Sequence, residues 1–146
     1  MLPLESSISP PLKAQGFRKK ARTWWRNRED TIQVINLQKD PWGGGRLHIN
    51  LGVYVRQLGS ELNPASHNCH VQARLENVAA EMYWNTIASA RSEPEPSPEL
   101  LEALLTDGVS WLNRVSTVEG IRAYLESGGT KKGMVVASVR NHVGYQ

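Results

Sequence analysis

The sequence lacks most features of secreted proteins and membrane proteins. Its 146 residues include one cysteine, Cys69, so no disulfide can form within the chain and a reducing compartment is expected. No run reaches the roughly 18 consecutive apolar residues of a membrane helix. The N-terminus has neither the basic nor the apolar region of a secretory signal. We therefore expect a cytoplasmic protein that makes no membrane contact.

Specific catalytic, metal and cofactor motifs are also missing. The glycines Gly43–Gly45 lead into a β-patterned run, whereas a dinucleotide or phosphate loop leads into a helix. His67, Cys69 and His70 are close in sequence, but no second Cys or His pair completes a tetrahedral zinc set. The sequence predicts no catalytic residue, no metal site and no cofactor, and it favours a non-enzymatic protein.

What is present fits a single domain. A chain of 146 residues with 40% hydrophobic residues can bury one sizeable core. Composition and patterning divide residues 1–146 into a flexible lead-in at 1–11, a mainly β part at 17–90, a Pro-rich linker at 91–98 and a mainly α part at 99–146. A short helix of at most two turns is expected within residues 6–15, which contain two successive prolines.

The clearest pattern is a β-hairpin at residues 32–55. Two β-patterned runs, 32–39 and 46–55, are joined by a Pro-Trp-Gly-Gly-Gly turn. One face of the second run carries only aliphatic side chains: Leu47, Ile49, Leu51, Val53 and Val55. A slip of one residue would bury the polar side chains of the opposite face, so the register is firmly specified. We place this hairpin in the middle of an antiparallel sheet.

A polar sheet face is the first candidate site. Residues 67–75 read as a further strand, and pairing with residues 46–55 brings five polar side chains to one face: His48, Asn50, His70, Gln72 and Arg74. These groups can bind an anion or a polar ligand, or move a proton. The alternative is a solvated face that needs no purpose beyond solubility.

A basic and aromatic strip is the second candidate site. Read as one edge strand, residues 17–28 place Arg18, Lys20, Arg22, Trp24 and Arg26 on one side, with Trp42 at the tip of the hairpin nearby. Such a strip can bind nucleic acid, although a guarded sheet edge needs the same residues. We favour packing of Trp42 onto the sheet over its exposure as a contact residue.

The C-terminal part reads as helical. Ser97 and Thr117 are predicted N-caps, the first followed by Pro98, and each precedes an apolar stripe at helical spacing. Residues 134–143 are also predicted to be helical, whereas residues 84–87 fit either a last short strand or a helical turn. The predicted fold class is α+β, with an antiparallel sheet of four to five strands and two to three C-terminal helices packed on one face.

Charge is unevenly distributed along the chain. Residues 1–75 contain 11 Lys and Arg against 5 Asp and Glu, whereas residues 76–127 contain 3 against 9. The simplest interpretation is mutual compensation, in which acidic helices lie beside a basic sheet edge.

Several segments together resemble an uncharacterised bacterial family known only as domain of unknown function DUF4304. The resemblance runs from about Leu12 to Leu125 and rests on these stretches in order: residues 16–20, 24–26, 32–39, 49–54, 69–75 and 111–112. It implies a small bacterial domain without an established activity. It therefore supports the fold class and the cytoplasmic location, and it leaves the function open.

Three functional hypotheses remain. The favoured one is a protein-binding module, and toxin-neutralising immunity proteins are one bacterial class that suits a small, charge-segregated domain. The second is nucleic-acid binding through residues 18–28, which requires this strip to stay free of the acidic helices. The third is a ligand-binding or hydrolytic domain that uses the polar sheet face, which requires a concave pocket and a shifted histidine pKa.

Overall fold

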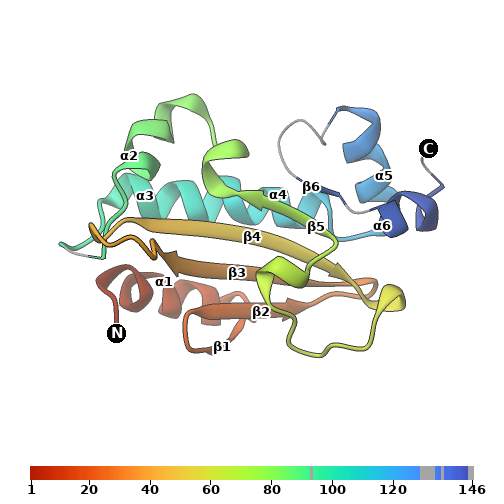
Figure 1. Ribbon diagram of the computed structural model, residues 1–146, viewed down its shortest axis with the longest axis horizontal. Coiled ribbons are helices and arrows are strands. Elements are labelled where there is room, and N and C mark those ends of the chain that lie inside the picture. Colours follow the sequence, from red (N-terminus) through yellow and green to blue (C-terminus); the bar gives the residue numbers. More distant parts are fainter. Residues whose placement is uncertain (93, 129–133, 136, 145–146) are drawn as a thin grey trace.

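The structure, a computed structural model, describes residues 1–92, 94–128, 134–135 and 137–144. Its centre is an antiparallel sheet in which each strand neighbours the next strand of the sequence (Figure 1). The strands are β1 (Arg18–Lys20), β2 (Thr23–Asn27), β3 (Thr31–Lys39), β4 (Leu47–Val55), β5 (Val71–Arg74) and β6 (Met134–Val135). The predicted α+β class is confirmed, and the two-residue β6 adds one strand to the four to five expected.

The β3–β4 hairpin has the predicted register. Thr31 pairs with Val55 at one end and Lys39 with Leu47 at the other. The five aliphatic side chains of β4 predicted to share a face are all at most 1% exposed. Gly43, Gly44 and Gly45 at the turn all have positive φ, a conformation that other residues rarely adopt. The hairpin therefore forms because the alternation and the turn chemistry agree.

Helices cover one face of the sheet, which we call the helix-covered face. They are α1 (Pro3–Ala14), α2 (Trp84–Ala88), α3 (Pro98–Glu102), α4 (Val109–Arg114), α5 (Val118–Glu126) and α6 (Ala137–His142), with a π-helical turn η5 (Ala103–Gly108) between α3 and α4. The continuous helical segment from α3 to α4 runs behind the sheet in Figure 1. Both predicted caps are present, because Ser97 accepts from the Leu100 N–H and Thr117 from the Gly120 N–H.

The opposite face, called here the reverse face, is only half covered. The segment between β4 and β5 contains the short helices η1 (Arg56–Leu58) and η2 (Ser66–Asn68) and crosses in front of the sheet in Figure 1. Beneath it lies a small apolar cluster: Trp25, Ile32, Val34, Tyr54 and Cys69. The indole N–H of Trp25 donates to the Pro64 carbonyl at 2.8 Å, which holds the segment onto the sheet. On strands β1 to β5, the rest of the reverse face is polar.

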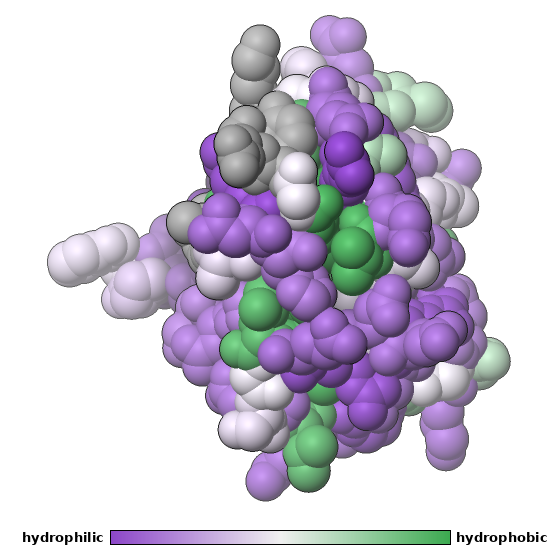
Figure 2. Space-filling model, turned by 90° about the vertical axis from the view of Figure 1, so that its right-hand side faces the viewer, coloured by the Kyte–Doolittle hydropathy of each residue, from purple (hydrophilic) through white to green (hydrophobic). Residues whose placement is uncertain are grey.

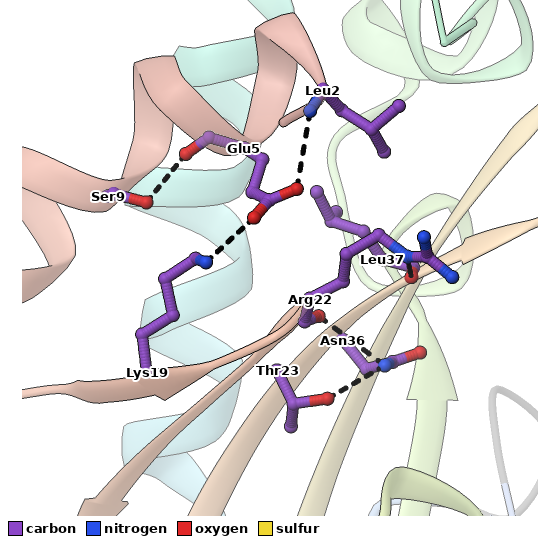
Figure 3. Close-up of polar contacts among 8 residues, drawn as sticks. All are labelled: Leu2, Glu5, Ser9, Lys19, Arg22, Thr23, Asn36 and Leu37. Atoms are coloured by element: carbon purple, nitrogen blue, oxygen red, sulfur yellow. Dashed lines mark hydrogen bonds and ion pairs between the residues drawn. The ribbon is translucent and has the colours of Figure 1, made fainter.

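The N-terminal residues form one helix that includes most of the short helix expected within residues 6–15, is longer than predicted, and replaces the expected flexible lead-in. Helix α1 begins at Pro3 and contains Pro10 and Pro11, and its residues Leu4, Ile8 and Leu12 are at most 1% exposed. Glu5 is also buried, and its carboxylate accepts from Lys19 Nζ on β1 at 2.7 Å (Figure 3). Burial of this apolar stripe offsets the backbone hydrogen bonds that the two prolines cannot donate.

Residues 17–28 form a hairpin and not the single edge strand that we predicted. Arg18 pairs with Trp25 and Lys20 with Thr23. The chain reverses at Ala21, whose φ of 52° lies in the left-handed region, so a turn forms without Gly, Pro or Asn. Residues that pair across two antiparallel strands project to the same face of the sheet. The hairpin therefore distributes the side chains of residues 17–28 between the two faces differently from a single strand.

The strand-rich part also ends earlier than predicted, at Arg74. Residues 75–90 contain the short helices η3 (Leu75–Asn77) and η4 (Glu81–Tyr83) followed by α2, so the segment 84–87 is helical. In the predicted C-terminal helix at 134–143, the first two residues form β6 and Ala137–His142 form α6. In the portions that the structure describes, no helix combines the length and apolar character needed to cross a membrane.

Figure 2 shows the end of the molecule to the right of Figure 1. Its surface is mainly hydrophilic, with small and separate hydrophobic patches. Large contiguous apolar patches mark many protein or membrane contacts. The described residues at this end of the molecule therefore form no broad apolar docking surface.

Candidate functional site

Five polar side chains form a row across the open half of the reverse face. In the register of the sheet, Lys20 is opposite Thr23, Thr23 opposite Asn36, Asn36 opposite Asn50 and Asn50 opposite Arg74. Directly opposed residues of antiparallel strands project from the same face and are close neighbours. With strands about 4.8 Å apart, this polar row spans about 19 Å from β1 to β5.

Hydrogen bonds order the middle of the polar row. Asn36 Nδ2 donates to Thr23 Oγ1 at 3.0 Å and to the Arg22 carbonyl at 3.4 Å, as Figure 3 shows. Asn50 Nδ2 in turn donates to Asn36 Oδ1 at 3.1 Å and to Gln38 Oε1 at 3.0 Å. Each side chain therefore fixes the orientation of the next, which preorganises the surface.

A pocket of about 630 Å³ lies over this row. It is lined by Thr23, Asn36, Gln38, Asn50, Leu51, Ala65, Ser66, His67, Gln72, Ala73 and Arg74. The turn at residues 65–67, which belongs to the segment that covers the apolar half, forms one wall of the pocket. Gln72 Nε2 donates to the carbonyls of His67 and Cys69 at 3.1 and 2.8 Å, so the sheet and this wall are held together.

Two cations at the ends of the polar row have no acidic partner in the described parts of the chain. Lys20 and Arg74 are both exposed, and no carboxylate there lies within 4 Å of either. In the described parts of the chain, one ion pair joins the basic part of the sequence, residues 1–75, to the acidic part, residues 76–127. It forms between Arg46 and Glu76 at 3.8 Å. Direct ion pairing between the basic and the acidic part is therefore limited to this one contact in the described residues.

The predicted polar face divides into three places. Asn50, Gln72 and Arg74 line the pocket together. His48 lies opposite Gln38, whereas His70 lies beside Tyr54 at the other end of β4, with ring centroids 4.6 Å apart. Six residues of strand separate the two positions, or about 20 Å. The expectation that the two histidines lie together is wrong.

The environments of the two histidines differ. His70 Nδ1 accepts from the Val55 N–H at 2.9 Å, and burial lowers the pKa of His70. Burial is also the main cause that lowers the pKa of His48, and the positive charges of Arg74 and Arg46 add to it. The Nδ1 atom of His48 is buried without a partner in the described residues. Both imidazoles therefore favour the neutral form.

The predicted basic and aromatic strip is dispersed. Trp24 is 1% exposed on the helix-covered face, and Arg26 is also buried there. Arg18, Lys20 and Arg22 remain exposed around the β1–β2 hairpin, and Arg22 Nε donates to the Leu37 carbonyl at 3.3 Å. Trp42 is 93% exposed at the tip of the β3–β4 hairpin, so the favoured interpretation of a packed Trp42 is wrong.

Three residues of the site were missed by reasoning from the sequence. Thr23, Asn36 and Gln38 line the pocket beside the predicted Asn50. A signal for two of them is present in the hairpin itself, because a turn at residues 40–45 places Asn36 opposite Asn50 and Gln38 opposite His48. Thr23 is placed opposite Asn36 by the pairing of β2 with β3, which the reading of residues 17–28 as one edge strand did not assign.

The site offers binding groups more than reactive ones. In the part of the chain that is described, no hydrogen bond joins a hydroxyl or thiol to an imidazole, and no three metal-binding side chains cluster. Burial raises the pKa of the Cys69 thiol to about 12, which keeps it protonated. The residues that line the pocket carry amides, two hydroxyls, an imidazole and a guanidinium, which suit a polar and negatively charged group.

These features define a small α+β protein whose antiparallel sheet carries helices on one face and an open polar pocket on the other. The chain belongs to the family described as domain of unknown function (DUF4304), whose model matches residues 8–114. The match spans strands β1 to β5 and the helices as far as α4, and it confirms the resemblance noted in the sequence. No curated protein and no solved structure matches the chain.

Proposed function

We propose that this protein is a non-enzymatic binding module that docks another protein on the polar row of its reverse face. The observation that carries the proposal is Arg74, an exposed residue that lines a preorganised pocket and has no carboxylate within 4 Å in the described chain. Arginine is enriched at binding hot spots because it forms several directed hydrogen bonds to one partner group. The partner is expected to present a negatively charged group there.

A protein partner is favoured over nucleic acid by the placement of the aromatic residues. Binding of single strands relies on exposed aromatic rings that stack on bases. Trp24 and Trp25 are both buried, at 1% and 8% exposed, and the exposed Trp42 lies at the tip of the β3–β4 hairpin, outside the residues that line the pocket. A ligand-binding role remains compatible with the pocket, whereas a hydrolytic role lacks a paired nucleophile and base in the described residues. We place the binding in the cytoplasm, in keeping with the single thiol.

The test is affinity capture from a nuclease-treated native lysate with three forms of the protein. The wild type and Arg122→Glu are expected to capture the same protein, and Arg74→Glu is expected to lose it. Arg122 is a matched control because it is an exposed arginine on α5, on the helical side of the molecule. Capture of the same protein by Arg74→Glu contradicts the proposal. Capture that occurs only when the nuclease treatment is left out also contradicts it.

A further inference from the structure

The backbone fixes how two amides of the pocket are turned. Asn36 Nδ2 and Gln72 Nε2 each face a backbone carbonyl, that of Arg22 for Asn36 and those of His67 and Cys69 for Gln72. A carbonyl can only accept a hydrogen bond, so the amide nitrogen must be on that side. Asn36 Oδ1 therefore faces Asn50, and Asn50 must present its own nitrogen in return.

This arrangement leaves two amide oxygens free to accept. Both N–H groups of Asn50 are engaged, with Asn36 and Gln38, and both N–H groups of Gln72 are engaged with backbone carbonyls. Asn50 Oδ1 and Gln72 Oε1 receive no hydrogen bond from the described residues. Both side chains line the pocket, so these two oxygens are acceptors available to a ligand.

The donors of the pocket lie next to these acceptors. Arg74 is directly opposite Asn50, and Gln72 projects from the same face two residues earlier on β5. Cβ atoms of directly opposed residues are about 5 Å apart, and residues two apart on a strand are separated by about 7 Å. The residues that carry a cationic fork and two amide oxygens therefore line one small region of the pocket.

A ligand group that satisfies this region must carry a negative charge and a donor side by side. A phosphate diester or a bare carboxylate supplies acceptors for Arg74 and no donor for Asn50 and Gln72. A sugar supplies hydroxyl donors and no charge. A peptide segment supplies both where a carboxylate lies beside a backbone N–H, either at the end of a chain or at an Asp or Glu side chain.

We infer that Arg74 binds a carboxylate of the partner while Asn50 Oδ1 accepts from the N–H group beside that carboxylate, with Gln72 Oε1 next to it as an acceptor for a further donor of the partner. This inference rests on the proposed function and names the chemical group that the partner presents. The role of Gln38 is to orient Asn50, because Gln38 Oε1 accepts a hydrogen bond from Asn50 Nδ2. The site thus distinguishes a peptide carboxylate from other anions.

The test uses small probes and nuclear magnetic resonance of the labelled full chain. N-acetylglycine carries a carboxylate beside an N–H, acetate lacks the N–H, and N-acetylglycinamide lacks the carboxylate. Saturable shifts of the Arg74 Nε–H signal and the Asn50 side-chain amide are expected with N-acetylglycine. Its affinity should exceed that of acetate by about 2- to 10-fold, which corresponds to one added hydrogen bond. N-acetylglycinamide should leave the Arg74 signal unchanged.

A fourth probe separates the two sources of the carboxylate. The α-amide of N-acetylaspartic acid has its carboxylate only on the side chain. Binding as tight as that of N-acetylglycine assigns the pocket to an acidic side chain, and weaker binding assigns it to a chain terminus. Both results agree with the inference, whereas equal affinity for acetate and N-acetylglycine, or no saturable shift at Arg74 with any carboxylate, overturns it.

A variant tests the role of the acceptor directly. Asn50→Ala is expected to reduce the affinity for N-acetylglycine to that for acetate and to leave acetate binding unchanged. Asn85→Ala on α2 is the control, because Asn85 is exposed and lies outside this pocket. Comparison of probes on the wild type does not depend on how well the variant folds. If capture of the partner depends on Arg74 but the probes show no preference, this inference is refuted and the proposed function stands. If N-acetylglycine is preferred but capture does not depend on Arg74, the proposed function is refuted.

Discussion

Residue type alone does not decide what the tryptophans do in this protein. Trp24 and Trp42 both follow polar or turn-forming residues in the sequence, yet one is 1% and the other 93% exposed. Trp24 pairs with the buried Ile35 of β3 and so projects towards the helices, where Lys19 Nζ lies 5.5 Å from the centre of its ring. Residues 17–28 read as one edge strand with polar residues on both sides, so the burial of Trp24 was not predicted.

The first prediction compares the two tryptophans. Trp24→Ala should lower the free energy of unfolding by about 3–5 kcal/mol, because it opens a cavity in the core. Trp42→Ala should change it by about 0.5 kcal/mol or less, because the ring has almost no contacts to lose. Urea denaturation monitored by circular dichroism measures both. A large loss in Trp42→Ala would show that this ring packs against the protein in solution.

The second prediction concerns acid sensitivity. The pKa values of His48 and His70 are lowered in the folded chain relative to the ordinary value of 6.5. The folded state then binds fewer protons than the unfolded state, so stability is greatest above pH 6.5 and falls as the pH decreases below it. The free energy of unfolding should therefore decrease between about pH 7.5 and about pH 5.5.

Histidine signals followed by nuclear magnetic resonance provide the direct measurement for this prediction. Both imidazoles should titrate below 6.5, the ordinary value. His48→Gln should lose less stability on acidification than the wild type does. A midpoint above that value for either histidine contradicts the prediction, since it would mean that the folded state favours the charged form.

At the scale of elements, prediction succeeded where one local signal was strong. The alternation of β4 and the caps Ser97 and Thr117 define their elements because burial and hydrogen bonding both act within a few residues. Helix α1 was misjudged because Pro10 and Pro11 disfavour a helix locally, while its stabilisation comes from distant core contacts. Tertiary burial overrode local preference there.

A buried network links several elements and carries the third prediction. Arg26 Nε donates to Gln33 Oε1 at 2.7 Å, and Arg26 Nη2 and Gln33 Nε2 both donate to Asn113 Oδ1 of α4, at 2.9 and 3.0 Å. The guanidinium also lies 4.4 Å from the centre of the Phe17 ring. This arginine joins β2, β3 and α4, although the sequence reading assigned it to a binding strip.

Loss of this guanidinium should therefore affect stability. Arg26→Ala is expected to lower the free energy of unfolding by about 2–5 kcal/mol, because it leaves the buried Gln33 Oε1 without its donor and removes the guanidinium that packs on Phe17. Arg26→Lys should restore only part of the loss, since an ammonium cannot form the same planar fork. Denaturant unfolding measures all three forms. Wild-type stability in Arg26→Ala would show that the network contributes little.

At the scale of the whole molecule, the sequence predicted a polar sheet face but not its extent. The segment 56–70 covers half of the reverse face, and its placement depends on contacts such as Trp25 Nε1 to the Pro64 carbonyl and Arg18 Nη2 to the Leu62 carbonyl. These contacts join residues 39 and 44 positions apart. Alternation assigns a residue to a face, but only the register shows which residues of that face are neighbours, and this is why His48 and His70 were wrongly grouped.

The fourth prediction follows from the separation of core and binding surface. Lys20 and Arg74 lie on the reverse face, whereas the main core and the network around Arg26 lie on the helix-covered face. Lys20→Glu/Arg74→Glu should therefore unfold with a free energy within about 0.5 kcal/mol of the wild type and fail to bind the partner. Arg26→Ala should show the opposite pattern at low temperature, with partner binding retained and stability reduced. Thermal and urea unfolding, measured beside capture of the partner, distinguish the two surfaces. Destabilisation by the double charge reversal would mean that the polar row contributes to folding, and it would remove the physical basis for assigning that row to binding.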